Sequence, residues 1–157
     1  MSASRDRRGA PRDEPRSRLH LEDQLCFALY AASRAMTAVY APMLDALDLT
    51  YPQYLVLLVL WDHDGERVSQ IGDRLQLDSA TLTPLLKRLE ARGLVERRRS
   101  AADERVVEVF LAAEGKRLKR RAAEIPMCVF EKSGLSEADL VALRATLQDL
   151  TRRLRAE

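Results

Sequence analysis

Apolar residues recur at spacings of three and four along several stretches of this chain, which is the pattern of amphipathic helices. The first stretch covers residues 21–47 and carries an apolar stripe from Leu21 to Leu47. Glu22 and Asp23 stand where their charges oppose the dipole of such a helix. We therefore predict one long helix over residues 21–47.

Capping residues divide the next stretch into three helices. Residues 50–53 (TYPQ) form a capping box with a proline near the first helical position. This box predicts a helix to about His63, whose inward-facing residues are Tyr54, Leu55, Leu58 and Val59. A short helix follows at about 69–75, and a third one runs from about 79 to 92, where a glycine ends it.

Period-two alternation then replaces the helical pattern, which predicts a β-hairpin from residues 94–99 and 105–111. A helix follows at about 114–125 and is interrupted by Pro126. The last helix begins at Ser136. Its leucines, spaced three, four, three and four apart, are Leu140, Leu143, Leu147, Leu150 and Leu154.

This order of elements predicts a mainly α protein with a small β-hairpin wing. We assign a winged helix-turn-helix to about 51–111 and dimerisation helices to about 20–47 and 113–155, within a single domain at 19–157. The heptad-like spacing of the last helix favours burial against a second copy. Packing against helices of the same chain is the alternative.

Composition places the chain among ordinary soluble proteins, since 46% of its residues are hydrophobic and 32% are charged. No apolar run approaches the roughly 18 residues of a membrane span, and no signal peptide is expected. Two cysteines are too few for a secreted disulfide scaffold, and His20 and His63 are isolated. We expect a cytoplasmic protein with no membrane partner, metal or cofactor.

Charge is unevenly distributed. Residues 1–18 hold six arginines and two prolines, which predicts a disordered basic tail, either merely solvated or weakly attracted to phosphate. Residues 87–105 hold seven basic and four acidic side chains. Such local positive charge is what phosphate contacts require.

The helix at 79–92 combines a leucine face with an opposite polar face, which alone would indicate only a solvated surface. Its place between a short helix and a basic hairpin favours insertion into the major groove of DNA. The residues that we expect to face DNA are Ser79, Thr81, Thr83, Pro84, Lys87 and Arg88.

The hairpin supplies a second set of candidate DNA contacts. Arg97, Arg98 and Arg99 can reach phosphates. Asp103 and Arg105 are two residues apart, so the carboxylate can fix the guanidinium for a narrow minor groove. An ordinary surface ion pair is the alternative.

Cys26 lies near the start of the first helix, where a negative charge is favoured, and Tyr30 follows one turn later on the same face. Taken alone, this position is more typical of a buried structural cysteine, because free cysteines are often buried.

Four segments nevertheless resemble a known family: LCFALYAASR around Cys26, LTYPQYLVLL at 49–58, LDSATLTPLLKRLE at 77–90 and GLVERRRSAADER at 93–105. Over residues 20–152 the chain is similar to the MarR family of winged-helix regulators, in its organic hydroperoxide resistance branch.

The resemblance implies a homodimeric repressor that binds double-stranded DNA with an inverted-repeat operator and responds to organic hydroperoxide. Cys26 matches the peroxide-reactive cysteine, with Tyr30 in its pocket and Tyr40 and Tyr51 reaching it from the partner subunit. Cys128 implies the two-cysteine type, in which it resolves oxidised Cys26 by a disulfide between subunits.

Within the same resemblance, Ser79, Thr81, Lys87 and Arg88 carry over as residues of the recognition helix. Asp103 and Arg105 carry over as the wing pair. Ala112 departs from a threonine that is common after the wing, which predicts a weaker helix cap.

Two rival functions remain at this point. One is a MarR-type regulator that releases DNA on binding a small aromatic ligand, with both cysteines structural. The other is a thiol peroxidase, which the absence of a βαβ pattern disfavours. We therefore expect a regulator and not an enzyme.

Overall fold

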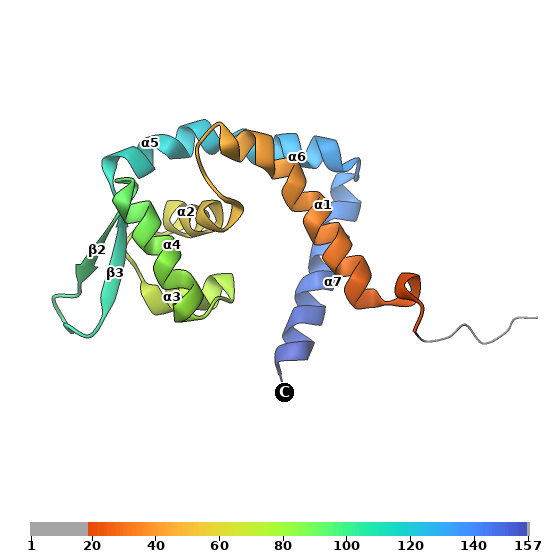
Figure 1. Cartoon of the computed structure of the whole chain (residues 1–157), viewed down its shortest axis with the longest axis horizontal. Coiled ribbons are helices and arrows are strands. Elements are labelled where there is room, and N and C mark those ends of the chain that lie inside the picture. Colours follow the sequence, from red (N-terminus) through yellow and green to blue (C-terminus); the bar gives the residue numbers. More distant parts are fainter. Residues whose placement is uncertain (1–18, 157) are drawn as a thin grey trace, which may run out of the picture. The chain divides into compact units, whose positions relative to one another are not determined.

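The computed structural model describes residues 19–156 (Figure 1), and the expected basic tail at 1–18 lies outside the described residues. The chain divides into two compact units, and the boundary falls within one helix, between Ala35 and Met36. The two units are described separately.

The first unit begins with a 3-10 turn, η1 (Leu21–Asp23), and continues into the first part of α1 (Leu25–Asp45). The prediction of one continuous helix over 21–47 is therefore wrong at both ends. Gln24 has extended backbone angles and separates the two helices. Glu22 and Asp23 consequently belong to η1 and not to the first turn of α1.

The second unit contains the capping box predicted at Thr50. Its hydroxyl accepts the Gln53 N–H, and the Gln53 side chain accepts the Thr50 N–H. The helix that it opens, α2 (Tyr51–Asp62), buries six residues along its length. Leu58 was expected to point inward but is exposed. The face of α2 that packs into the core is formed by its buried residues, which are Gln53, Tyr54, Val56, Leu57, Val59 and Leu60.

The helix-turn-helix consists of α3 (Val68–Leu75) and α4 (Ser79–Ala91). In the turn, Gln76 is left-handed and the Leu77 N–H donates to the Gly72 carbonyl. A Cβ on Gly72 would lie 2.9 Å from the Leu77 carbonyl oxygen. Glycine at this position therefore allows the turn to close tightly.

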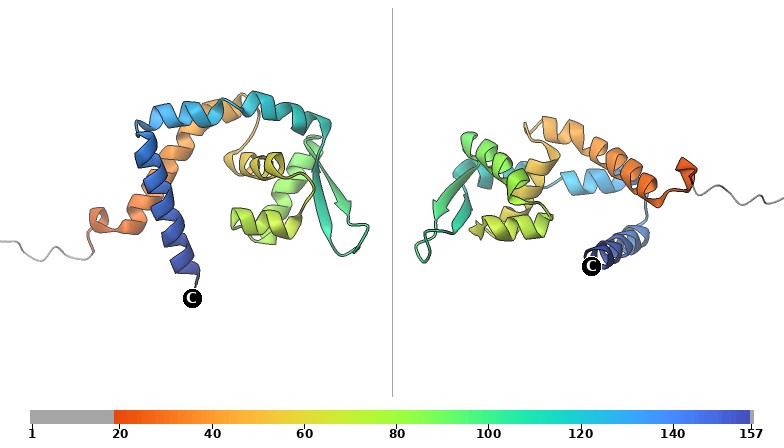
Figure 2. Two further views of the ribbon diagram at one scale, coloured as in Figure 1. Left: turned by 180° about the vertical axis from the view of Figure 1, so that it is seen from behind. Right: turned by 60° about the horizontal axis from the view of Figure 1, so that its bottom comes forward.

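The wing is an antiparallel sheet with strand order β1-β3-β2, formed by β1 (Glu66–Arg67), β2 (Val95–Arg99) and β3 (Val107–Leu111). The hairpin of β2 and β3 confirms the prediction, whereas the two-residue strand β1 was not predicted. The hairpin extends beside α3 and α4, which it contacts (Figure 2).

Three helices follow the wing: α5 (Ala113–Ala122), α6 (Ile125–Ser133) and α7 (Glu137–Arg155). Ser136 caps α7, as predicted, by accepting the Asp139 N–H. Ala112 makes no side-chain cap at α5. Pro126 stands in the first turn of α6, so it begins a new helix where we expected only an interruption.

The core lies among α2, α3, α4, the sheet, α5 and α6, and Leu44 at the end of α1 also belongs to it. Val56, Leu57, Ile71, Leu89 and Val109 are completely buried there. This core fixes α4 against the wing and leaves the opposite side of α4 facing solvent.

Candidate DNA interface and cysteine positions

The start of α4 is fixed by Asp78, whose carboxylate accepts the Thr81 N–H at 2.7 Å. That hydrogen bond holds the pKa of Asp78 below its ordinary value, so the cap remains charged. Four leucines of α4 are buried. Of the predicted DNA-facing residues, those that are exposed are Ser79, Thr81, Pro84, Lys87 and Arg88.

Thr83 differs from the other residues of this face. It is half-buried, and its hydroxyl donates to the Ser79 carbonyl at 2.7 Å. Pro84 follows within the same helical turn and cannot donate a backbone hydrogen bond. Thr83 therefore supports the first turn of α4 in addition to lying near its solvent side.

The wing is attached to α4 by one ion pair. Glu90 of α4 accepts the Arg97 main-chain N–H at 3.1 Å and two guanidinium N–H groups at 2.9 and 2.6 Å. These hydrogen bonds hold the pKa of Glu90 below its ordinary value. The guanidinium of Arg97, predicted to contact phosphate, is thus also a brace between wing and helix.

Arg98 and Arg99 are exposed on β2. The Arg98 guanidinium pairs with Glu96 at 2.6 Å and lies over the Phe110 ring, 4.9 Å from its centroid. At the hairpin tip, Asp103 accepts the main-chain N–H of Arg105 at 2.9 Å. The structure thus places the carboxylate on the backbone of Arg105, and not on its guanidinium as we had expected.

A hollow of about 310 Å³ lies where α3, α4 and the wing meet. Its lining includes Arg67, Thr83, Arg97 and Arg105, so predicted contacts from helix and hairpin share one surface. Arg67 was missed by the sequence analysis, because it precedes the short helix and belongs to no basic run.

Three tyrosines of the second unit form a cluster. The rings of Tyr40 and Tyr51 have centroids 5.0 Å apart, and Tyr54 lies 6.0 Å from Tyr40. Burial raises the pKa of all three phenols, that of Tyr54 to about 12. The phenols therefore keep their protons at neutral pH and can donate hydrogen bonds.

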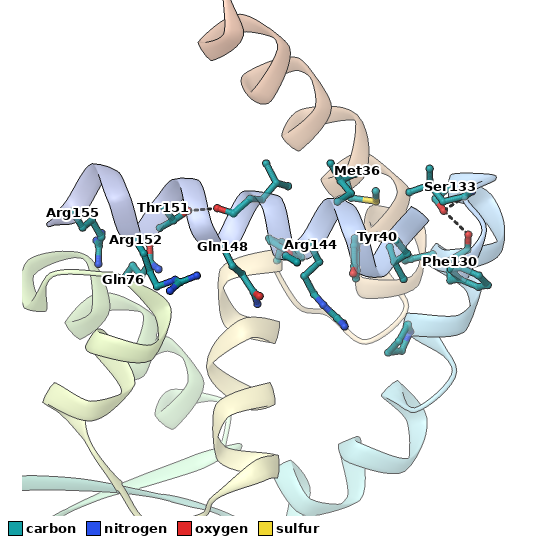
Figure 3. Close-up of a pocket in the computed structure, with 18 of the residues that line it drawn as sticks. Met36, Tyr40, Gln76, Phe130, Ser133, Arg144, Gln148, Thr151, Arg152 and Arg155 are labelled. Atoms are coloured by element: carbon teal, nitrogen blue, oxygen red, sulfur yellow. Dashed lines mark hydrogen bonds between the residues drawn. The ribbon is translucent and has the colours of Figure 1, made fainter. Parts of the chain in front are cut away.

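Tyr40 and Tyr51 face an open apolar groove of about 1330 Å³, lined largely by α6 and α7 (Figure 3). Leucines of α7 form much of its wall, and the cations Arg144, Arg152 and Arg155 stand along one side. The predicted phenolic donors thus open onto a mostly apolar surface. Tyr54, which lies one turn after Tyr51, is buried as the sequence predicted, but the sequence analysis did not include it among the tyrosines of the cysteine site.

Cys26 is the second residue of α1 and is exposed in the single chain, whereas its sequence surroundings, taken alone, were more typical of a buried cysteine. Tyr30, one turn later, is also exposed, and its hydroxyl accepts a hydrogen bond from Arg34 at 3.2 Å. Cys128 lies on α6 and is partly exposed.

Other types of site are not seen in the described part of the chain. Within residues 19–156, no group of three histidine, cysteine or acidic side chains is arranged to hold a metal ion. None of the described helices has both the length and the apolar content needed to cross a membrane.

Comparison with known proteins gives a consistent result. A family profile described as "Transcriptional regulator SarA/Rot" matches residues 38–122. An organic hydroperoxide resistance transcriptional regulator of Bacillus subtilis is 50% identical over 132 residues, covering 84% of this chain and 90% of that protein. The HTH-type transcriptional regulator TtmR of Methylorubrum extorquens is 48% identical over 145 residues, covering 92% of this chain and 73% of TtmR.

Among solved structures, reduced AbfR bound to DNA, from Staphylococcus epidermidis, superposes with a TM-score of 0.74 at 34% identity. The match covers 87% of this chain and 93% of that one. The two curated relatives are named as transcriptional regulators and the AbfR structure contains DNA, in agreement with the expectation of a regulator.

Proposed function

The chain belongs to the MarR/SarA-type winged-helix regulators, in the branch of organic hydroperoxide resistance regulators, and from this membership we propose a homodimeric repressor that releases its operator when Cys26 is oxidised. DNA binding in the regulation of transcription is the function that members of this family have in common. The dimer, the peroxide signal and the role of each residue are our proposal.

The exposed face of α4 enters the major groove in this proposal, and the hairpin reaches the adjacent minor groove. The Glu90–Arg97 pair supports this arrangement, because its hydrogen bonds join α4 to the wing, and we call these two elements together the reading head. Arg99 and Arg105, for which no ion pair is described, are then available for phosphate and groove contacts. An operator with two-fold symmetry would present its half-sites about 34 Å apart.

A second copy would cover the leucine stripe of α7. Leu143, Leu147 and Leu154 are exposed in the single chain, and α7 has no buried residue. Such a dimer would bring Tyr40 of the partner subunit and Tyr51 of the partner subunit to Cys26. Their protonated phenols suit a thiolate acceptor.

The proposed chemistry begins with attack of the Cys26 thiolate on the terminal oxygen of an organic hydroperoxide. The O–O bond breaks, the sulfur becomes a sulfenic acid and the alcohol leaves after taking up a proton. The thiol of the partner subunit's Cys128 then attacks the sulfenic sulfur, forming a disulfide and releasing water. A bridge requires Cα atoms within about 7 Å, so its formation can displace the helices that carry the reading heads.

The observation that carries the redox part of the proposal is the position of Cys26, an accessible thiol at the second residue of a helix. A helix N-terminus favours negative charge, and exposure gives the peroxide access. The apolar side chains around it, Leu25 and Phe27, favour a peroxide with an organic tail.

The test is operator binding by fluorescence anisotropy before and after cumene hydroperoxide. The wild type should lose affinity on oxidation, almost a thousandfold for a loss of about 4 kcal/mol. Cys26→Ser should bind DNA and ignore the peroxide, and release by this variant contradicts the assignment. Cys128→Ser should still respond, but without a band for the linked dimer on a non-reducing gel.

The apolar groove beside Tyr40 favours a second candidate function, in which a small aromatic ligand triggers release. Its arginines could pair with a ligand carboxylate. Release of DNA by an aromatic acid from the double variant Cys26→Ser/Cys128→Ser would favour this alternative. Release that needs Cys26 would exclude it.

A further inference from the structure

The segment 46–50 joins α1, which carries Tyr40, to α2, which begins at Tyr51. Asp48 is left-handed, with φ of 53°, a conformation that is disfavoured for a residue with a Cβ. The leucines on either side of it are buried, so the segment is tethered at Leu47 and Leu49. This segment is the covalent connection between the two helices that carry the tyrosines.

The guanidinium of Arg92 binds this segment from the end of the recognition helix. Nη1 donates to the Asp48 carbonyl, Nη2 donates to the Leu47 carbonyl at 3.3 Å, and Nη2 lies 3.1 Å from the Asp48 carboxylate. Arg92 is itself the C-cap of α4, and its main-chain N–H donates to Arg88. The Arg92 side chain thus joins segment 46–50 to α4, the helix that we propose to read DNA.

The surroundings of Arg92 connect it to the proposed DNA contacts as well. A hollow of about 660 Å³ is lined by residues that include Asp48, Arg88 and Arg92. Of these three, Arg88 is the residue that we expect to contact DNA. On the other side of the segment, Arg121 of α5 donates to the Ala46 carbonyl at 3.2 Å. The segment is therefore held by two arginines, and Arg92 is the one that belongs to the reading head.

We propose that Arg92 is the positioning residue that couples the Tyr40–Tyr51 pair to the recognition helix. The proposal rests on the proposed function, in which oxidation of Cys26 disturbs the tyrosines that face it. A planar guanidinium with several fixed donors can hold two carbonyls and a carboxylate at once, so the segment and the end of α4 move together. Without this link, oxidation would move the segment and leave α4 in place.

The experiment compares Arg92→Gln with Arg121→Gln. The second variant removes an equivalent arginine-to-carbonyl bond from the same segment, but on α5. The probe is a fluorescein-labelled DNA duplex selected from a random-sequence pool by the reduced wild type. For each full-length protein, anisotropy gives the ratio of the Kd after cumene hydroperoxide to the Kd before it.

We expect Arg92→Gln to lower this ratio at least about 5-fold relative to the wild type, the lower end of typical coupling between sites. Arg121→Gln should keep the wild-type ratio. A purely structural role of Arg92 would weaken DNA binding in both redox states and leave the ratio unchanged. An unchanged ratio in Arg92→Gln, or an equal loss in Arg121→Gln, overturns the proposal.

Arg92→Lys covers the case in which Arg92→Gln does not fold, as monitored by the fluorescence of Trp61, the chain's one tryptophan. Lysine keeps the charge beside Asp48 but cannot span both carbonyls. We expect a ratio between those of wild type and Arg92→Gln, and a wild-type ratio overturns the coupling. A wild-type protein that does not respond to peroxide at all overturns the proposed function itself, which is a different result.

Discussion

The winged part of the chain and its last helix differ sharply in how much each one buries. In the single chain, α2 buries six residues and α4 buries four, whereas the nineteen residues of α7 bury none. Both α4 and α7 carry regular apolar stripes, whereas α2 is apolar around most of its circumference. Amphipathic periodicity therefore identifies a face that must be covered, but it does not say whether the cover comes from the same chain.

The difference in burial indicates that the winged part and the last helix have different roles. The winged part is packed in a core to which the end of α1 and the helices α5 and α6 also contribute, and this core fixes the geometry of the DNA-reading surface. The last helix keeps Leu143 and Leu147 exposed. In the proposed dimer, this helix sets the distance between the DNA-reading surfaces of the two subunits. Substitutions in the two regions should accordingly fail in different ways.

The largest effect is expected from Leu147→Glu. In the proposed dimer this glutamate would carry a charge into an apolar interface, and burial of a charge costs several kcal/mol. The monomer should still fold, because Leu147 contributes no buried side chain to it. Light scattering after gel filtration should show half the mass of the wild type, and affinity for the symmetric operator should fall with it.

Ala142→Glu is the matched control for that experiment. It places the same charge on α7 at an exposed position that does not line the groove. This variant should remain a dimer. A dimeric Leu147→Glu protein would show that the leucine stripe of α7 is not the interface.

A smaller effect is expected from Leu89→Ala in the winged part. Leu89 is completely buried, and removal of such a side chain costs about 2–5 kcal/mol. Urea unfolding followed by Trp61 fluorescence, at equal protein concentrations, should show the loss. Leu58→Ala is the control, because Leu58 is 39% exposed and should cost clearly less. If Leu58→Ala and Leu89→Ala lowered the free energy of unfolding equally, Leu58 would have to be buried in the dimer.

Elements marked by local signals were predicted well from the sequence. The capping box at Thr50 and the cap at Ser136 begin their helices as expected, because a cap is a contact between neighbouring residues. Pro126 was misjudged, since proline both ends helices and occupies their first turn. The break at Gln24 left no trace in the apolar spacing, which continues across it.

The candidate site was predictable as a set of residues but not as a set of contacts. The exposed face of α4 follows from its periodicity alone. The partner of Arg97 is Glu90, on another element, and the partners of Arg92 lie more than forty positions away. Such contacts depend on how helices pack, which spacing along one helix does not encode. The wing pair shows the same limit, since Asp103 binds the backbone of Arg105.

The smallest effect is expected at the brace between α4 and the wing, and it should depend on pH. The pKa of Glu90 is lowered in the folded protein from its ordinary value of 4.5, mainly by hydrogen bonds from Arg97. A lowered pKa means that the charged carboxylate stabilises the fold. This contribution is complete above pH 4.5 and is lost as the pH falls through the lower, folded value.

Glu90→Gln should therefore reduce stability at neutral pH by less than about 1 kcal/mol, as is usual for a partly exposed pair. The difference from wild type should vanish in acid. Hydrogen exchange at the Arg97 N–H, which donates to Glu90, is the most local measurement. It should be faster in the variant at neutral pH and equal in both proteins well below pH 4.5.

Glu96→Gln removes a charge from the exposed Arg98 pair, so it should leave the exchange rate of the Arg97 amide unchanged. If both variants accelerate this amide equally, the brace has no special role, and the wing is held to α4 by its buried side chains alone.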